Sequence, residues 1–246
     1  MAEVLLEFEE SVAVITINDP ERRNALTIDL SQELADKVEE AQTQANALIV
    51  TGAPPAFCAG ADLTQLGNSK DEGLRNIYKG FLAVKNAEIP TIAAVNGAAV
   101  GAGLNLALAA DVRVAGPRAR FDARFLQLGI HPGGGMTWML QKTTNAQVAT
   151  AMTLFGQILD ADQAVAHGLA YAKAEDPLAV AKELAKVAAE APAALVRTIK
   201  ATMRKTDAMQ VHADAVEAEL GPQVESIDTP EFAARLAAMK ARISGR

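Results

Sequence analysis

Short apolar runs alternate with amphipathic segments along the first 190 residues. Val4 to Phe8 and Val12 to Ile17 predict two strands joined as a hairpin, and Ala47 to Thr51 predicts a strand buried on both faces. Between them, Thr27 is a plausible N-cap for a helix, because apolar residues recur there at helical spacing. These apolar positions are Leu30, Leu34, Val38, Ala41 and Ala45. The pattern predicts an α/β fold built from repeated strand and helix units.

The stretch from Pro90 to Asp111 contains strand, turn and helix signals in immediate succession. Thr91 to Val95 predicts a buried strand, Gly101-Ala102-Gly103 keeps side chains away from the backbone, and Leu104 to Ala109 predicts an apolar helix. The free N–H groups at such a helix start can hydrogen-bond an anion or a carbonyl oxygen that becomes one. A closely packed buried helix explains the same small residues equally well.

A second stretch of this kind, Ala53 to Leu63, follows the strand at Ala47 to Thr51, and two such backbone sites can face one oxygen atom. Further motifs are Arg23-Asn24-Ala25-Leu26 near the start and Leu128-Gly129-Ile130 before Pro132-Gly133-Gly134. In their order and spacing, these motifs resemble the enoyl-CoA hydratase/isomerase (crotonase) family. The resemblance covers essentially the whole chain.

The resemblance implies a crotonase-like spiral of ββα units with a helical C-terminal region. Residues 1–190 would form the acyl-CoA-binding core, and residues 191–246 would form a helical oligomerisation region. The last predicted helix, Glu231 to Ile243, carries an apolar stripe of Phe232, Leu236 and Met239. By resemblance this tail packs around neighbouring subunits of a homotrimer or a dimer of trimers. A monomeric helical cap is the alternative.

Composition narrows the class of protein. The 246 residues carry a formal net charge of -7, which argues against nonspecific binding to nucleic acid or anionic membranes. No apolar run reaches the roughly 18 residues of a membrane span, and the N-terminal residues show no secretory signal, so we expect a cytoplasmic protein. Cys58 is the single cysteine and the three histidines are scattered, so neither an internal disulfide nor a metal site is expected.

An acidic protein can still hold a polyphosphate ligand through a few local cations. Arg22 and Arg23, beside the Asn24-Ala25-Leu26 motif, are candidates for binding coenzyme A. By resemblance the segment containing Ala59, Ala61 and Leu63 binds it as well. No cofactor is expected, because coenzyme A is part of the acyl-CoA substrate.

An acyl thioester becomes reactive when its carbonyl oxygen takes up negative charge as an enolate, so two fixed N–H donors at that oxygen are the shared requirement of the family's reactions. The resemblance implies that the donors are the backbone N–H groups of Ala61 and Ala102. Family members usually carry glycine at the second position, and the Cβ of Ala102 restricts the backbone more. Asp62 is expected to cap or orient the turn after the first donor.

The hydratases of this family use two glutamates, and this chain has Asn105 and Phe125 where the motifs place them. Neither side chain takes a proton from water at neutral pH. The candidates to replace them are His131, Asp122 and Asn105, the last as a hydrogen-bonding group. His131 has a suitable ordinary pKa of roughly 6.5. The alternatives are that His131 only binds loop backbone and that Asp122 pairs with Arg120 or Arg124.

Two functions remain open. The first is an enzyme of acyl-CoA or fatty-acid metabolism, a lyase or isomerase that stabilises an enolate but hydrates poorly. The second is a protein that binds or carries acyl-CoA without transforming it. A dinucleotide site is disfavoured, because Gly101-Ala102-Gly103-Leu104-Asn105-Leu106 has Leu where the third glycine or alanine belongs. The segment Gly67 to Asn86 is expected to cover the acyl site.

Overall fold

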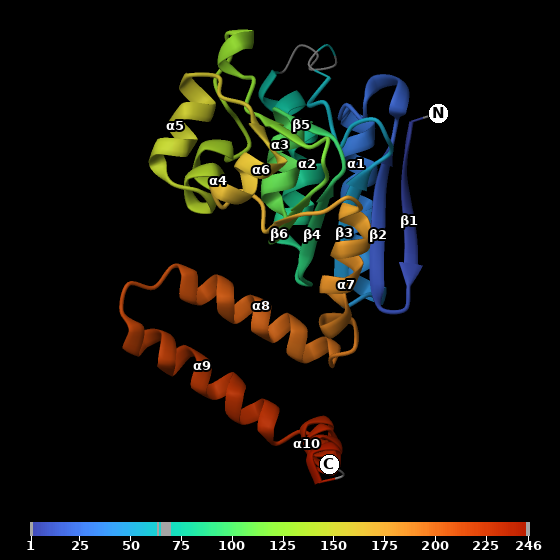
Figure 1. Ribbon diagram of the computed structural model, residues 1–246, viewed down its shortest axis with the longest axis vertical. Helices are drawn as coiled ribbons and strands as arrows, with labels where there is room; N and C mark the ends of the chain where they lie inside the picture. The colour runs from blue at the N-terminus through green and yellow to red at the C-terminus, as the bar shows by residue number, and fades with distance from the viewer. Residues whose placement is uncertain (1, 63, 65–69, 245–246) are drawn as a thin grey trace. The chain divides into compact units, whose positions relative to one another are not determined.

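The structure is a computed structural model that describes residues 2–62, 64 and 70–244. The chain divides into two compact units, Met1–Ala189 and Glu190–Arg246. The first unit holds all the strands of the described chain, and the second holds three helices (Figure 1). The mixed α/β architecture predicted from the apolar pattern is confirmed.

The larger sheet has six strands in the order β1-β2-β3-β4-β6-β9. They are β1 (Glu3–Glu9), β2 (Val12–Asn18), β3 (Ala47–Gly52), β4 (Thr91–Val95), β6 (Val112–Ala115) and β9 (Ala172–Lys173). The predicted hairpin of β1 and β2 is antiparallel, and every later pair is parallel. All six residues of β3 and all five of β4 are buried. This explains why their sequences are mostly apolar, without alternation.

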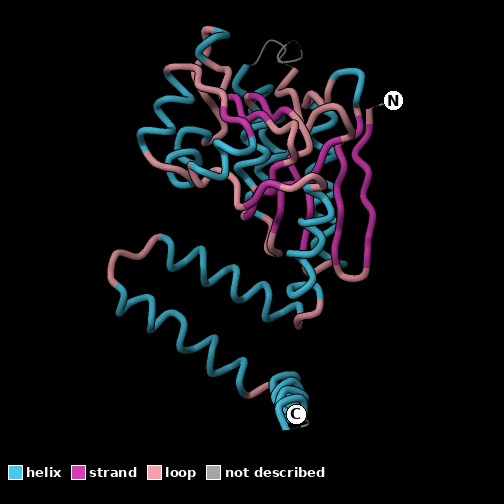
Figure 2. Tube along the Cα trace, viewed as in Figure 1, coloured by secondary structure: helices cyan, strands magenta, loops and turns pink. Residues whose placement is uncertain are grey.

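Helices cover both faces of this sheet (Figure 2). One face packs against α1 (Ile28–Gln44), with α2 (Lys70–Asn86) and α3 (Ala102–Ala109) completing that layer. The predicted cap is confirmed, since the Thr27 side chain accepts a hydrogen bond from the Leu30 N–H over 3.0 Å. On the other face, α7 (Pro177–Ala189) packs Ala181 and Ala185 against strand residues such as Ile49. The sheet is therefore the middle layer of three.

A second sheet of three strands lies beside the larger one, in the order β5-β7-β8. It contains β5 (Ala98–Val100), β7 (Arg120–Asp122) and β8 (Leu159–Asp160). Sequence reasoning missed β5, because three residues between two glycine turns carry no periodicity. It also started α3 at Leu104, whereas the helix begins at Ala102. Strand β5 is therefore followed almost directly by the first turn of α3.

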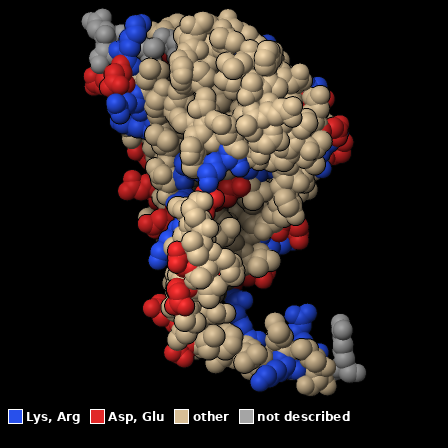
Figure 3. Space-filling model, turned by 90° about the vertical axis from the view of Figure 1, so that its left-hand side faces the viewer, with Lys and Arg blue, Asp and Glu red and all other residues tan. Residues whose placement is uncertain are grey.

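The remaining elements of the first unit are short. They are the 3₁₀ helices η1 (Pro20–Arg22) and η3 (Leu126–Leu128), and the helices α4 (Met136–Thr143), α5 (Ala146–Leu154) and α6 (Ala161–Ala166). Glycines with positive φ follow the ends of α5 and α6, at Gly156 and Gly168. The face shown in Figure 3 has a broad uncharged surface. Beyond α5, the side chain of Phe155 is 81% exposed.

The second unit consists of α8 (Ala193–Asp207), α9 (His212–Ile227) and α10 (Pro230–Ser244). Neither α9 nor α10 contains a buried residue. The predicted stripe of Phe232, Leu236 and Met239 is present on α10 and is exposed along its length. Among the described residues, no helix is long and apolar enough to cross a membrane.

Candidate active site

The two glycine-containing segments identified in the sequence lie side by side. Cys58 and Ala99 form a parallel bridge, and the N–H of Val100 donates to the carbonyl oxygen of Cys58 over 3.0 Å. On its other side, the first segment pairs with the Arg23 to Leu26 motif, because the Leu26 N–H donates to the Gly60 carbonyl over 2.7 Å. Three motifs that are far apart in the sequence thus form one continuous backbone layer.

Gly60 brings the two predicted donors together. Its φ is +112°, and a Cβ at this position would lie 2.9 Å from the carbonyl oxygen of Val100 and 4.0 Å from the nitrogen of Ala102. Only glycine allows this approach. Among the described residues, the N–H groups of Ala61 and Ala102 donate to no other group. Two backbone donors are therefore available on adjacent segments.

The backbone around Ala102 explains why alanine is accepted there. Gly101 has an unusual backbone conformation, with φ of 53° and ψ of -113°. Ala102, the next residue, is the first residue of helix α3. A first-turn residue has ordinary helical angles, which any L-residue adopts, and its N–H has no partner within the helix. The donor predicted at Ala102 thus has a compatible geometry without glycine.

Both donors border a cavity of about 430 Å³. The predicted site residues that line it are Ala59, Ala61, Ala102, Asn105, Phe125 and His131. Helix α2, which lies in the Gly67 to Asn86 segment expected to cover the acyl site, and the segments near η3 contribute further lining residues: Lys70, Leu74, Ile77, Tyr78, Arg124, Leu128 and Ile130. The lining is mostly apolar with a few polar groups, as in typical pockets for small molecules. Of the described residues that line it, none is Asp or Glu.

Asn105 is fixed at the floor of this cavity. Its Nδ2 donates to the carbonyl oxygen of Gly133 over 2.9 Å, and the residue is 1% exposed. Its Oδ1 is buried and has no hydrogen-bond partner. Gly134 packs against the same side chain, since a Cβ there would lie 2.7 Å from the Asn105 nitrogen. The amide holds the loop after His131 in place and leaves one acceptor unused.

Phe125 lies beside the entrance to helix α3. The tip of its ring would be 3.9 Å from a Cβ at Gly101, one residue before the predicted donor Ala102. The ring is partly buried against the main core. At the position where the resemblance places the second glutamate, the side chain that lines the cavity is therefore apolar.

Asp122 and His131 differ in their surroundings. Asp122 is 3% exposed, forms an ion pair with Arg124, and is not among the residues that line the cavity. This is one of the alternatives that the sequence left open for Asp122. His131 is exposed and lines the cavity, and its Nδ1 lies 2.6 Å from the carbonyl oxygen of Pro132. His131 thus combines contact with loop backbone and access to the cavity, and its acid–base role stays a prediction.

The Arg22 to Leu26 motif has a structural centre and an exposed cationic edge. The buried Asn24 donates from Nδ2 to the carbonyl oxygens of Ala53 and Ala56, both over 2.8 Å, and so holds the loop before the first donor. Arg22 pairs with Asp19 over 2.7 Å and keeps 49% of its side chain exposed. Arg23 is exposed as well. The cations predicted for coenzyme A therefore lie on the surface beside the donor segment.

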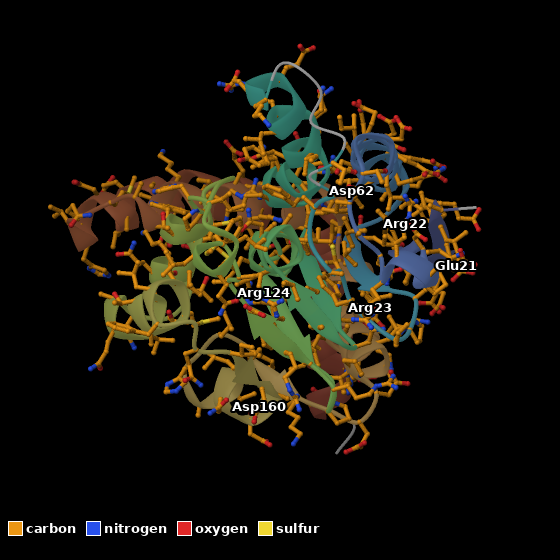
Figure 4. The ribbon with its side chains drawn as sticks, turned by 90° about the horizontal axis from the view of Figure 1, so that it is seen from above. Glu21, Arg22, Arg23, Asp62, Arg124 and Asp160 are labelled. Atoms are coloured by element: carbon orange, nitrogen blue, oxygen red, sulfur yellow. The ribbon has the colours of Figure 1, made fainter. Side chains whose placement is uncertain are left out.

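Asp62 has the turn-orienting contacts expected of it. Its Oδ1 accepts hydrogen bonds from the Thr64 hydroxyl over 2.6 Å and the Thr64 N–H over 3.1 Å. These bonds lower the pKa of Asp62, with a smaller contribution from Arg22, which lies on the same side of the molecule (Figure 4). Leu63, also predicted to bind coenzyme A, lies outside the described residues. No group of three His, Cys, Asp or Glu side chains suited to a metal ion occurs in the described chain.

Tyr78 and Arg124 were not identified from the sequence. A signal for Tyr78 existed, because Leu74, Ile77, Tyr78 and Phe81 follow the spacing of one helix face. That face packs toward the donor segments, which only the tertiary structure reveals. Arg124 carried no such signal, since its φ of 56° and its pairing with Asp122 depend on the turn after β7.

Two adjacent free N–H donors at an apolar cavity, carried by a spiral α/β fold, define the class of the crotonase-fold proteins. The chain belongs to the enoyl-CoA hydratase/isomerase family, whose model matches residues 7–240. It is 54% identical to a Mycobacterium tuberculosis protein named "Probable enoyl-CoA hydratase EchA14", covering 97% of this chain and 98% of that protein.

Solved structures agree with this assignment. A crystal structure of a probable enoyl-CoA hydratase/isomerase from Mycobacterium abscessus has a TM-score of 0.87 and 28% identity, covering 97% of this chain and 96% of that one. A crystal structure of an enoyl-CoA hydratase from Bacillus anthracis has a TM-score of 0.89 and 26% identity, covering 98% and 96%. The predicted family and fold are therefore confirmed over almost the whole chain.

Proposed function

We propose that this protein binds acyl-CoA thioesters and holds the thioester oxygen between the N–H groups of Ala61 and Ala102, as part of acyl-CoA or fatty-acid metabolism. The observation that carries the proposal is the close approach of Gly60 to Val100 and Ala102, which brings together two residues with unpaired N–H groups that line the cavity. Fixed donors of this kind stabilise an oxygen as it gains negative charge.

The enolate is the intermediate that such a site favours. When a thioester loses a proton from the carbon next to its carbonyl group, negative charge moves to the carbonyl oxygen. The two N–H donors can stabilise this charge by hydrogen bonds. Because the donors belong to the backbone, they need no reorganisation during the reaction. The start of helix α3 adds a favourable dipole at Ala102. We therefore propose a reaction of the lyase or isomerase type.

We do not propose that the protein hydrates enoyl-CoA efficiently. Attack by water needs a group that takes a proton near neutral pH, and the two positions of the family's glutamates hold Asn105 and Phe125. Reactions that only move a proton next to the thioester need fewer groups. The candidates to move it include His131, which lines the cavity.

The second candidate function is binding or carriage of acyl-CoA without turnover. It is favoured by the absence of Asp and Glu among the described residues that line the cavity. The donor pair is compatible with it, since the same N–H groups also bind the oxygen of an unreacted thioester. The two functions share a binding site and differ only in proton transfer.

One experiment separates them. Acyl-CoA thioesters of several chain lengths and oxidation states are incubated with the protein and followed by mass spectrometry, while binding of each is titrated in parallel. Binding together with at least one product supports the enzyme. Binding with no product from any thioester supports the carrier function. If no thioester binds or raises the melting temperature, both functions are contradicted.

We also propose that the helical C-terminal region packs against other copies of the chain in a homotrimer or a dimer of trimers. Helices α9 and α10 bury no residue, although α10 carries the apolar stripe of Phe232, Leu236 and Met239. Exposed apolar stripes of this length favour association. The mass in solution, measured by light scattering, tests the proposal, and a monomer would contradict it.

A further inference from the structure

Tyr78 presents its hydroxyl group to the candidate active site. It projects from helix α2 and lines the cavity, and its ring packs against the buried Phe81 with centroids 5.4 Å apart. The hydroxyl end is equally confined, because a Cβ at Gly133 would lie only 2.1 Å from the Tyr78 oxygen. The phenol is therefore held at both ends. The second tyrosine of the chain, Tyr171, is 68% exposed and is not among the residues that line this cavity.

Gly133 connects this hydroxyl group to the donor helix. Its carbonyl oxygen accepts the hydrogen bond of Asn105, and Asn105 lies one turn after Ala102 on helix α3. The phenol, the amide and the second N–H donor thus meet around one loop. The unused Oδ1 of Asn105 adds a buried acceptor there, which a polar ligand group or a water can occupy.

The reaction proposed for this site needs a group that carries a proton. Among the described residues that line the cavity, the side chains without a permanent charge that can exchange a proton are the phenol of Tyr78 and the imidazole of His131. His131 is exposed, and its Nδ1 already contacts the Pro132 carbonyl oxygen. Tyr78 is more enclosed and is positioned by packing on two sides, which favours proton transfer in a fixed geometry.

The surroundings of Tyr78 shift the pKa of its phenol in opposite directions. Burial, the largest influence, raises the pKa of its phenol, whereas the backbone of Gly134 and the guanidinium of Arg75 lower it, and Asp71 raises it slightly. Among the described residues that line the same cavity, Lys70 and Arg124 are the cationic side chains and His131 contributes an imidazole. Because the pKa is raised overall, the phenol keeps its proton at neutral pH, so its resting form is an acid.

We propose that Tyr78 carries a proton between solvent and the carbon next to the thioester carbonyl group. In the forward step the phenol O–H bond breaks and a new C–H bond forms with the electron pair of the enolate. The phenolate keeps the O–H electron pair and then takes a proton from water. In reverse, the phenolate removes the proton and the charge moves to the oxygen held by Ala61 and Ala102. This role rests on the proposed function, since it needs a bound thioester.

The test is the exchange of hydrogen for deuterium at this carbon in butyryl-CoA, followed by mass spectrometry in deuterated water. Tyr78→Phe keeps the ring against Phe81 and removes only the hydroxyl group. We expect it to slow exchange by about a hundred- to ten-thousand-fold, with butyryl-CoA binding unchanged in a parallel titration. Tyr171→Phe is the matched control and should exchange at the native rate.

The dependence of exchange on pH distinguishes this role from a structural one. Exchange through the Tyr78 phenolate should rise about tenfold per pH unit through neutral pH, because the phenolate fraction rises in that way below its pKa. Exchange through His131 would instead be abolished by His131→Ala and would be unaffected by Tyr78→Phe. In the Tyr171→Phe background only one tyrosine remains, so replacing it by the more acidic 3-fluorotyrosine should move the profile to lower pH.

Several results would overturn the role of Tyr78. They are exchange at the native rate in Tyr78→Phe, a pH profile unmoved by fluorotyrosine, and loss of exchange in His131→Ala with native exchange in Tyr78→Phe. Binding of butyryl-CoA without any exchange in the native protein would also overturn it, while leaving acyl-CoA binding intact. Failure to bind butyryl-CoA or any other thioester would remove the proposed function itself, so the two failures can be distinguished.

Discussion

The side-chain amide of Asn105 joins the donor helix to the glycine loop by donating a hydrogen bond to the carbonyl oxygen of Gly133 over 2.9 Å. Since the amide is almost fully buried, this bond fixes the position of the loop that carries His131 relative to Ala102. An amide can donate where the family's glutamate, once ionised, cannot. At the position where the resemblance places an acid–base group, Asn105 therefore forms a structural contact.

The first prediction follows from this contact. Asn105→Asp should destabilise the protein by about 1–3 kcal/mol at neutral pH, because a carboxylate cannot donate to the Gly133 oxygen and is left buried. Chemical denaturation measures the loss. Asn145→Asp is the matched control, since the Asn145 side chain accepts a hydrogen bond from the Val148 N–H at the start of α5 and Asp accepts equally well. Equal losses in both variants would contradict the role of the Asn105 amide.

A second prediction concerns hydration. We expect crotonyl-CoA to be hydrated about a hundred- to ten-thousand-fold more slowly than by an enzyme with both glutamates, because general acid–base assistance is worth that much. The loss of the enoyl absorbance measures the rate. A turnover number in the range of ordinary enzymes, unaffected by Asn105→Ala, would show that the acid–base positions are assigned wrongly.

The third prediction concerns the exposed cations. Arg23→Ala and Arg22→Ala should each weaken binding of coenzyme A, and added salt should weaken it further in the native protein, because the attraction to phosphate is screened. Calorimetric titration measures both effects. Lys173→Ala removes an exposed charge that pairs with Asp162 and should leave affinity unchanged. If all three variants bind equally well, the phosphates are held elsewhere.

The fourth prediction concerns the single cysteine. Cys58 is fully buried, and burial raises the pKa of its thiol to about 12. Only the thiolate reacts with alkylating agents, so at pH 8 iodoacetamide should leave the folded protein unmodified and label it after unfolding. The raised pKa predicts that reactivity of the folded protein increases only at strongly alkaline pH. Rapid labelling at pH 8 without unfolding would contradict this.

Much of the fold could be predicted because its strands and helices are strongly patterned. The residues of β3 and β4 are all buried and mostly apolar, and α1 shows clear helical spacing with a capping threonine. The short strands β5, β8 and β9 were not predictable. Their conformation comes from pairing with distant segments, which leaves no periodic signal in so short a run.

The candidate site was only partly predictable for a related reason. Glycines marked the two backbone segments, and the resemblance to the crotonase family assigned the donors to Ala61 and Ala102. The roles of Tyr78 and of the Asn105 amide depend on contacts with Gly133, which is 55 and 28 residues away in the sequence. Such contacts arise from tertiary packing and cannot be inferred from local residue patterns.

The central claim is that the N–H groups of Ala61 and Ala102 hold the thioester oxygen. Ala102→Pro tests it, because proline is well tolerated at the first position of a helix and has no N–H. Ala146→Pro, at the first position of α5, is the matched control. In both variants, thermal denaturation checks that the fold is retained.

The most direct measurement is the infrared frequency of the carbonyl group of bound butyryl-CoA labelled with ¹³C at that carbon. The account predicts that binding lowers this frequency in the native protein and in Ala146→Pro, because two donors polarise the carbonyl bond, and that Ala102→Pro loses much of the shift. Exchange at the neighbouring carbon should fall by about a hundred- to a thousand-fold in Ala102→Pro. A bound carbonyl frequency equal to that in water, or one unchanged by Ala102→Pro, would contradict the account.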